Sequence, residues 1–192
     1  MAPIAWSTLV LAMLLRQSVG SQVQVVNKCT FPIHLRADQL DEPEIQRVQP
    51  GGTYRAAYRN KVAYNPATGA DSAVGVSIKI SADSRLHNET GEDLLSLFTT
   101  SPVTQLEYTF DPTLKPGPDL YYDLSDIDDS SPRQFCKYGL ALIPQRNSCT
   151  PVVCPPDCER NCSSVYNYPS DDFATRGCES NVGLTLFLCS GS

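Results

Sequence analysis

Residues 74–81 read VGVSIKIS, and their pattern gives the clearest indication of fold class in the chain. Apolar residues stand at every second position from Val74 to Ile80, with small or polar residues between them. Successive side chains of a β-strand point to opposite faces, so this period of two indicates a strand with one buried face. Further alternating or apolar segments are TQLEYTF (104–110), DLYYDLSDI (119–127) and GLTLFLC (183–189). The sequence therefore predicts a mostly β protein.

The remaining segments predict shorter strands, turns and little helix. QVQVVNKCTFPIHL (22–35) is rich in β-branched residues but is interrupted by a proline, which indicates two short strands or one interrupted strand. Pro50-Gly51-Gly52 is a strong turn signal before the strand-like TYRAAYR (53–59), and NPATGADS (65–72) is typical of a loop. A short helical candidate, EDLLSLF (92–98), leaves helix as a minor component.

The first residues of the chain have the features of a secretory leader. A near-continuous apolar run, residues 6–15, is followed by the small residues Ser18 and Gly20 at a plausible cleavage site. We therefore expect residues 1–20 to be a signal peptide and the mature protein to be secreted, either extracellular or in a cell wall. The apolar run is too short to cross a membrane, and no later stretch is longer, so no membrane partner is expected.

All eight cysteines follow the predicted leader, and an even number in a secreted chain favours four disulfides. The alternative is a zinc site formed by the closely spaced Cys149, Cys154, Cys158 and Cys162. No CxxC pair occurs among them, and secreted cysteines oxidise, so we expect disulfides and neither metal nor cofactor. Residues 134–169 hold five of the eight cysteines, which predicts a small, loop-rich, disulfide-rich lobe on a β-sandwich.

Charge restricts the partners of the protein. The chain has 15 lysines and arginines against 21 aspartates and glutamates, a formal net charge of −6, and loss of Arg16 with the leader makes it more acidic. Such a surface repels phosphate backbones and anionic lipids, so we expect no nucleic acid or membrane-surface partner. Neutral sugars and cationic partners remain. Two sequons, at Asn88 and Asn161, predict N-glycosylation in a secreted chain.

Several of these segments, in the same order, resemble the thaumatin-like proteins. The matching stretches are VVNKCTFPIHL (25–35), VQPGGTYRAAY (48–58), VTQLEYTF (103–110), DLYYDLSDID (119–128) and, most specifically, VYNYPSDDFATRGC (165–178). The low cysteine number and a shortened cysteine-rich region are more similar to the small secreted fungal members, described as antigenic or yeast-phase-specific, than to plant members. The resemblance implies an antiparallel β-sandwich over residues 21–192, with residues 134–169 as its disulfide-rich lobe.

The resemblance also implies a disulfide pairing, which the sequence alone leaves open because eight cysteines allow about 105 pairings. The implied pairs are Cys29–Cys189, Cys136–Cys178, Cys149–Cys162 and Cys154–Cys158. The first would close nearly the whole chain and, in the entropic account of disulfides, restrict the unfolded state by about 5 kcal/mol.

An acidic cleft is the functional feature that the resemblance implies. Its acids fall on Glu107, Asp123, Asp128 and Asp171, and Lys79 stands near the position of the family's arginine. Glu107 and Asp123 are the candidate catalytic pair, because glycosidic hydrolysis needs two carboxyl groups about 5 to 9.5 Å apart. These residues are equally compatible with sugar binding, or with ordinary solvated acids on strands and loops of an acidic protein.

Other candidate residues carry weaker signals. His34 and His87 accompany no motif of nucleophilic or metal catalysis, so we expect ordinary satisfied or solvated histidines. Four tyrosines could stack on sugar rings, or could pack in the core with their hydroxyls at its rim: Tyr121, Tyr122, Tyr166 and Tyr168.

Three functions remain open from the sequence. We expect a monomeric, non-enzymatic secreted protein that binds cell-wall polysaccharide such as β-glucan, or a host protein, and that would act as an antigen or allergen in a fungal source. The second possibility is a weak β-1,3-glucanase that uses Glu107 and one of the aspartates. The third is an effector or structural scaffold that presents its loops to a protein partner.

Overall fold

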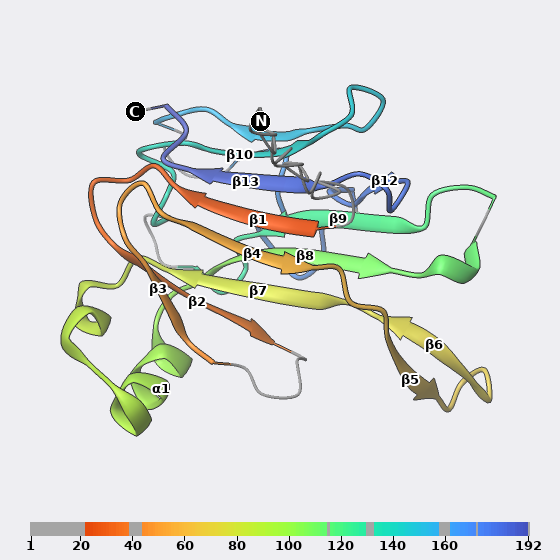
Figure 1. Ribbon diagram of the computed structural model, residues 1–192, viewed down its shortest axis with the longest axis horizontal. Helices are drawn as coiled ribbons and strands as arrows, with labels where there is room; N and C mark the ends of the chain where they lie inside the picture. The colour runs from red at the N-terminus through yellow and green to blue at the C-terminus, as the bar shows by residue number, and fades with distance from the viewer. Residues whose placement is uncertain are drawn as a thin grey trace, which may run out of the picture.

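The structure is a computed structural model that describes residues 22–38, 44–114, 116–129, 133–157, 162–171 and 173–191. The expected leader and the sequon residue Asn161 lie outside the described residues. Two stacked β-sheets form the body, as Figure 1 shows. The predicted mostly β, thaumatin-like sandwich is confirmed.

The first sheet has five strands in the order β11-β10-β13-β1-β4. Their bounds are β11 (Val152–Cys154), β10 (Leu140–Pro144), β13 (Leu184–Leu188), β1 (Gln22–Asn27) and β4 (Thr53–Ala57). Neighbouring strands are antiparallel except β1 and β13, which are parallel. The region 134–169 therefore contributes two strands to this sheet in addition to its loops.

The second sheet has six strands in the order β12-β9-β8-β7-β2-β3, and all neighbouring pairs are antiparallel. Its strands are β12 (Arg176–Cys178), β9 (Leu120–Ser125), β8 (Thr104–Phe110), β7 (Val76–Ser81), β2 (Ile33–Asp38) and β3 (Gln46–Val48). The segment 22–35 thus forms two strands, and they lie in different sheets.

The turn before β4 forms where the sequence predicts it. Gly51 has a φ of +76°, which a residue with a Cβ rarely adopts, and its N–H donates to Asn27 O at 2.8 Å. The Asn27 side chain donates to Val48 O at 3.0 Å and to Phe31 O at 2.9 Å. One buried asparagine therefore joins the end of β1 to the two segments that follow it.

A separate hairpin departs from the sequence prediction. Strands β5 (Lys61–Asn65) and β6 (Ala70–Val74) pair only with each other, so most of the expected loop 65–72 belongs to a hairpin. Val74 ends the hairpin, and Gly75 separates it from β7. A Cβ at Gly75 would lie 3.2 Å from Thr109 Oγ1, so glycine permits the close approach of β8 at this break.

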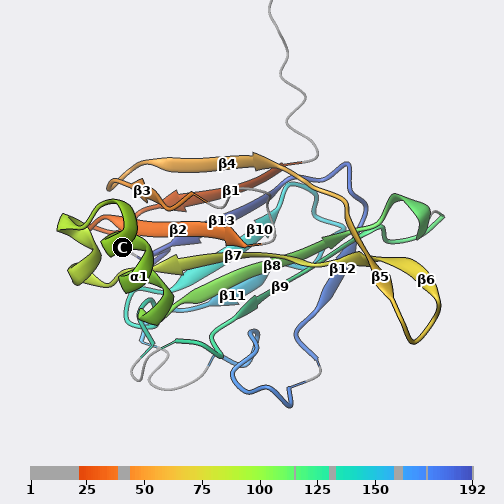
Figure 2. The same ribbon diagram turned by 90° about the horizontal axis from the view of Figure 1, so that it is seen from below.

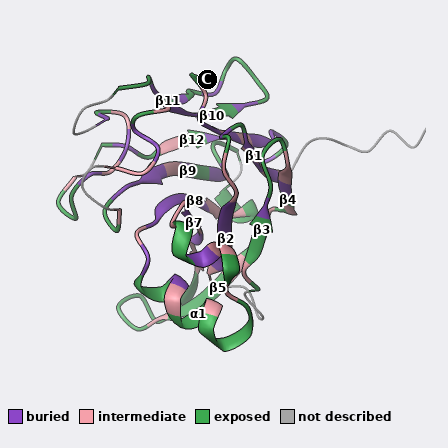
Figure 3. Ribbon diagram, turned by 90° about the vertical axis from the view of Figure 1, so that its left-hand side faces the viewer, coloured by how far each residue is buried: buried purple, intermediate pink, exposed green. Residues whose placement is uncertain are grey.

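The helical segments are short, as expected. They are the 3₁₀ turns η1 (Ser84–Asn88) and η2 (Pro112–Leu114) and one α-helix, α1 (Gly91–Thr100). Glu92 and Asp93 lie in the first turn of α1, where the helix dipole favours acids. A small cluster around Leu86, Phe98 and Val103 packs η1 against α1, and Figure 3 shows the outer turns of α1 exposed.

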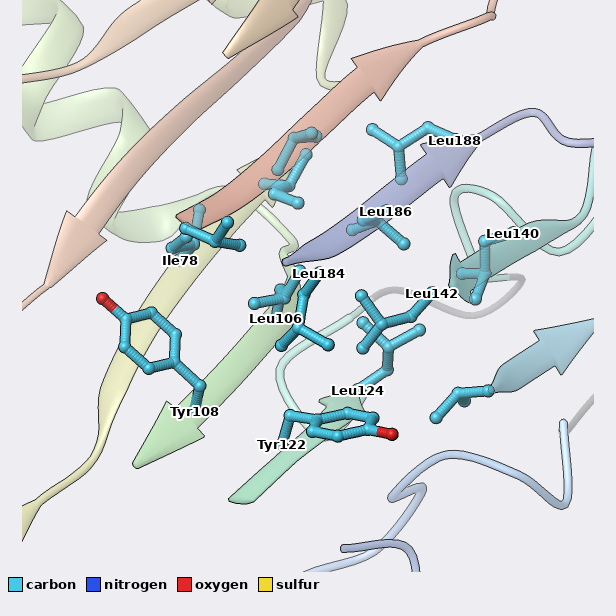
Figure 4. Packing of buried hydrophobic residues seen from close by; sticks show 14 of the residues in the cluster. Ile78, Leu106, Tyr108, Tyr122, Leu124, Leu140, Leu142, Leu184, Leu186 and Leu188 are labelled. Carbon is cyan, nitrogen blue, oxygen red and sulfur yellow. The ribbon is translucent and has the colours of Figure 1, made fainter. Parts of the chain in front are cut away.

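The main core lies between the two sheets. Figure 4 shows Ile78, Leu106 and Leu124 of the second sheet pointing toward leucines of the first sheet such as Leu142 and Leu186. Each of these five side chains is at most 1% exposed. Because every second residue of β7, β8 and β9 is committed to this core, the alternate residues lie on the outer face of the second sheet.

Three of the four implied disulfide pairs are wrong. Cys29 pairs with Cys189, as the resemblance implies, but Cys149 pairs with Cys178 and Cys154 with Cys162. The pairs Cys136–Cys178, Cys149–Cys162 and Cys154–Cys158 are thereby excluded, although Cys136 is also disulfide-bonded; Cys158 lies outside the described residues. The physical reason is placement: the folded chain holds the Cα atoms of both observed pairs 5.6 Å apart, a bonding distance that separation in sequence does not reveal.

Candidate functional site

The outer face of the second sheet carries rows of polar side chains, which we call the polar face. The strand register aligns Asp123, Glu107, Ser77 and Asp38 in one row across β9, β8, β7 and β2. The next row contains Ser125, Gln105, Lys79 and Arg36. Figure 2 shows these strands side by side, with α1 at one end and the β5–β6 hairpin at the other.

The first depression on this face lies toward the hairpin and is called the acidic hollow. It has a volume of about 270 Å³, and strands β7, β8 and β9 form its floor. Its lining residues are Gly75, Val76, Ser77, Glu107, Tyr108, Thr109, Tyr121, Asp123 and Thr175. The candidate pair Glu107 and Asp123 therefore lies in one hollow, on adjacent strands and directly opposite each other.

The two carboxyl groups perturb each other. Burial, together with the Glu107 charge, raises the pKa of Asp123 to about 7, although a hydrogen bond from Thr175 partly offsets this. Thr175 Oγ1 lies 3.5 Å from Asp123 Oδ2. Burial also raises the pKa of Glu107, and the Asp128 charge adds to the effect.

A shared proton accounts for this environment. Asp123 Oδ1 is buried and has no hydrogen-bond partner among the described residues, while Glu107 stands directly opposite on the next strand. One proton held between the two carboxyl groups would satisfy this oxygen. The pKa values of both acids are raised, that of Asp123 to about 7, so the pair as a whole retains a proton. Below about pH 7 the pair thus carries about one negative charge instead of two.

A second depression lies toward α1 and is called the helix-side hollow. It has a volume of about 420 Å³ and is lined by Arg36, Lys79, Phe98, Thr99, Thr100, Ser101, Val103 and Asp128. Asp128 Oδ2 accepts a hydrogen bond from Gln105 Nε2 at 3.2 Å. Asp128 therefore lies over the row that contains Gln105 and Lys79, beside the row of Glu107. Lys79 Nζ lies 3.0 Å from Asp38 Oδ2.

Asp171 has a different environment from the other expected acids. Its Oδ2 accepts hydrogen bonds from the backbone N–H groups of Asn167 at 2.8 Å and Tyr168 at 3.1 Å. It lines neither hollow. Its carboxylate closes the turn before β12, so its hydrogen bonds serve the local loop structure.

The tyrosines divide between core and surface. Tyr122 is fully buried and donates its hydroxyl to Thr150 O at 2.7 Å, whereas its neighbour Tyr121 is 36% exposed at the acidic hollow. Tyr166 Oη lies 2.8 Å from Thr175 Oγ1, which in turn contacts Asp123. Tyr121 thus forms the wall of the hollow on which an apolar sugar face could stack. Tyr166 does not line the hollow and instead contacts Thr175, the residue that hydrogen-bonds Asp123.

Sequence reasoning missed Thr175 and Arg36 as residues of the polar face. Thr175 follows a long loop, and only pairing of β12 with β9 brings it to Asp123. Arg36 occupies the outward position of an alternating strand, IHLRAD, so its side of the sheet could have been predicted but its neighbours could not. Within the described ranges, no group of three or more potential ligands is placed to bind a metal, and no helix is long and apolar enough to span a bilayer.

Comparison with known proteins identifies the family. Residues 10–190 match the model of the Blastomyces yeast-phase-specific protein family. The chain belongs to this family. Its thaumatin-like relatives include the "Antigenic thaumatin-like protein" of Arthroderma benhamiae, 34% identical over 108 residues that make up 54% of this chain. That match spans 51% of the relative, so this chain covers about half of its length.

Two further proteins match a larger part of the chain. The "Secreted thaumatin-like protein calA" of Emericella nidulans is 30% identical over 172 residues, 90% of this chain and 83% of the relative. These matches confirm the resemblance to thaumatin-like proteins, and specifically to the yeast-phase-specific fungal members. The crystal structure of the protein elicitor MoHrip2 from Magnaporthe oryzae superposes with a TM-score of 0.61 at 18% identity. It covers 88% of this chain and 99% of the elicitor, and at this identity the likeness shows a shared fold alone.

Proposed function

We propose that this protein is secreted and binds a polysaccharide of the β-glucan class in the acidic hollow, without hydrolysing it. Secretion is supported by the leader-like residues 1–20, by the disulfides and by the name of the Emericella relative. We also propose that this protein is an antigen in a host, which the name of the Arthroderma relative supports. A cell wall is the place where such a ligand would be met.

The observation that carries the proposal is the cross-strand contact of Glu107 and Asp123, which stand directly opposite each other in one hollow. Sugar hydroxyls both donate and accept hydrogen bonds, and a carboxyl pair that holds one proton also offers both functions. Tyr121 supplies an exposed ring beside the pair, and Ser77 and Thr175 add hydroxyl groups. A neutral, polyhydroxylated chain is the ligand that matches this lining.

The same contact argues against the glucanase alternative. The two carboxyl groups of a glycosidase flank the scissile bond and lie about 5 to 9.5 Å apart. Glu107 and Asp123 stand directly opposite each other on adjacent strands, so both carboxyl groups project from one face of the sheet and lie on the same side of a bound sugar. The pair is therefore suited to bind a glycan and poorly placed to cleave one.

Retention on insoluble β-1,3-glucan tests the proposal. The mature protein should sediment with the glucan and release no sugar, and Glu107→Gln and Asp123→Asn should each reduce the retained fraction. Glu92→Gln, an exposed acid on α1, is the matched control and should bind as the parent does. Release of reducing sugar would instead establish the glucanase, and absence of any retention would favour a protein partner for the scaffold.

A further inference from the structure

The guanidinium group of Arg36 lines the helix-side hollow and uses only some of its hydrogen-bond donors within the protein. Arg36 Nε donates to Asp38 Oδ1 at 2.7 Å, and the guanidinium carbon lies 5.7 Å from the centre of the Phe98 ring. These contacts orient the plane of the guanidinium. In the part of the chain that the structure describes, Nη1 and Nη2 have no hydrogen-bond partner, although the side chain is only 17% exposed.

A second cation lies beside this group. Lys79 Nζ is 3.0 Å from Asp38 Oδ2, so one carboxylate faces both Arg36 and Lys79. Burial alone would raise the pKa of Asp38, but hydrogen bonds from Arg36 and Lys79 hold it below the usual value. Asp38 is therefore ionised and compensates one of the two positive charges, which leaves one positive charge on this wall of the hollow.

The opposite wall of the hollow offers acceptors instead of donors. Thr99 Oγ1 donates to Ser96 O at 2.7 Å and Thr100 Oγ1 to Leu97 O at 3.1 Å, so the lone pairs of both hydroxyl oxygens remain available. Asp128 adds a carboxylate, of which Oδ2 accepts from Gln105. A ligand that fits must carry an anionic group on one side and hydroxyl donors on the other.

We propose that the helix-side hollow binds a uronic acid residue, with its carboxylate on Arg36 and Lys79 and its hydroxyls toward α1 and Asp128. The volume of about 420 Å³ lies within the usual range of about 300–1,000 Å³ for small-ligand sites. The inference rests on the proposed function, because the two hollows adjoin along the sheet and one glycan would occupy both. Lys79 pairs across the sheet with Gln105, two residues before Glu107. A glycan crossing both hollows would thus be acidic, with a neutral sugar at the carboxyl pair.

A singly charged sugar acid fits better than a phosphate group. The fork of a guanidinium binds carboxylate and phosphate alike. Asp38 leaves only one positive charge to compensate a ligand, and Asp128 repels a second negative charge, so the greater desolvation cost of a dianion is not offset. The acceptor wall also requires hydroxyls next to the acid, which inorganic phosphate cannot place there.

Calorimetry with a matched ligand pair tests the inference. The probes are a β-1,3-linked glucose oligosaccharide in which one residue is glucuronic acid and the same oligosaccharide with that carboxyl group reduced to an alcohol, so that only the charge differs. The mature protein should bind the acidic form about tenfold more tightly. Arg36→Gln should abolish this preference and Arg36→Lys should retain part of it; Lys79→Met provides a second test if Arg36→Gln fails to fold. Arg55→Gln, on the exposed face of the first sheet, should leave the preference unchanged.

Each outcome separates this inference from the function on which it rests. Equal affinity for the acidic and reduced forms overturns the uronic acid site and leaves the proposed glycan binding intact. If neither form binds, the proposed function itself fails. A preference that Arg36→Gln removes and Glu107→Gln preserves supports the site. Displacement of the acidic oligosaccharide by an equal concentration of inorganic phosphate shows a general anion site and overturns the sugar acid assignment.

Discussion

The two faces of the second sheet are made of alternate residues of the same strands, but they are determined in different ways. On the inner face, Leu106 and Leu124 contact the first sheet and are fully buried. On the outer face, Glu107 and Asp123 line an open hollow and lie in unfavourable electrostatic environments. The inner face supplies the free energy of folding, whereas the outer face retains perturbed groups of the kind found at binding sites.

The largest effect is expected from the inner face. Leu106→Ala should lower the free energy of unfolding by about 2–5 kcal/mol, because it removes a fully buried side chain and leaves a cavity between the sheets. Thr109→Ala, an outward residue of the same strand, should change it by less than about 1 kcal/mol. Urea unfolding of both variants measures the difference, and equal losses would refute the distinction between the faces.

The carboxyl pair should make stability depend on pH. The pKa of Asp123 is raised to about 7 in the folded protein, so the folded state binds its proton more tightly than the unfolded state does. Stability from this source is present below the usual aspartate pKa and is lost as pH rises through about 7, a change of order 2 kcal/mol. Asp123→Asn should flatten this decline in thermal unfolding between pH 4 and 8. A decline of the same size in the variant would assign the effect to another group.

His34 should give the opposite dependence in the same pH range. It is 2% exposed, its ring stacks on His87 at 5.7 Å, and Nδ1 has no partner among the described residues. Burial, with the nearby His87 and Arg47, lowers its pKa to about 4. The unfolded state thus binds the proton more tightly, and about 1–2 kcal/mol should be lost as pH falls from 6.5 toward 4. His34→Gln should lack this acid loss; an unchanged acid limb would contradict the assignment.

The smallest effect is expected at the sequon. Asn88 ends η1 and Thr90 directly precedes α1; both are exposed, so a glycan at Asn88 would extend into solvent. Asn88→Gln should remove one glycan mass from protein secreted by a eukaryotic host and change the melting temperature by no more than about 1 °C. Intact-mass measurement checks the first point, and an unaltered mass would show that Asn88 is not modified.

The local features of the fold could be predicted from the sequence. The alternation around Ile78 and Leu106 determined which side of each strand faces the core, and the turn at Gly51 and the helix at 91–100 followed from local signals. The features that were missed either lack a local pattern or depend on distant strands. The β5–β6 hairpin has little apolar alternation, and the partners of Cys149 and Cys154 depend on how distant strands are arranged.

The candidate site followed the same division. The residue types and outward positions of Glu107 and Asp123 could be predicted, but their direct opposition depends on the register of β8 with β9. Asp171 has the expected residue type and instead binds the backbone of its own loop. Arg36 was overlooked because nothing in its own strand indicates that Phe98 and Lys79 will surround it.

The pH dependence of glycan affinity is the most direct test of the account. Affinity for a soluble β-1,3-glucan oligosaccharide should be constant between pH 5 and 6 and fall about tenfold by pH 8, because dehydrating two adjacent carboxylates costs more than dehydrating one. In Glu107→Gln the amide can donate to Asp123 without a shared proton, so the remaining binding should lose this pH dependence. Binding that is independent of pH in the parent protein, or equally dependent in Glu107→Gln, would contradict the claim that the shared-proton pair holds the ligand.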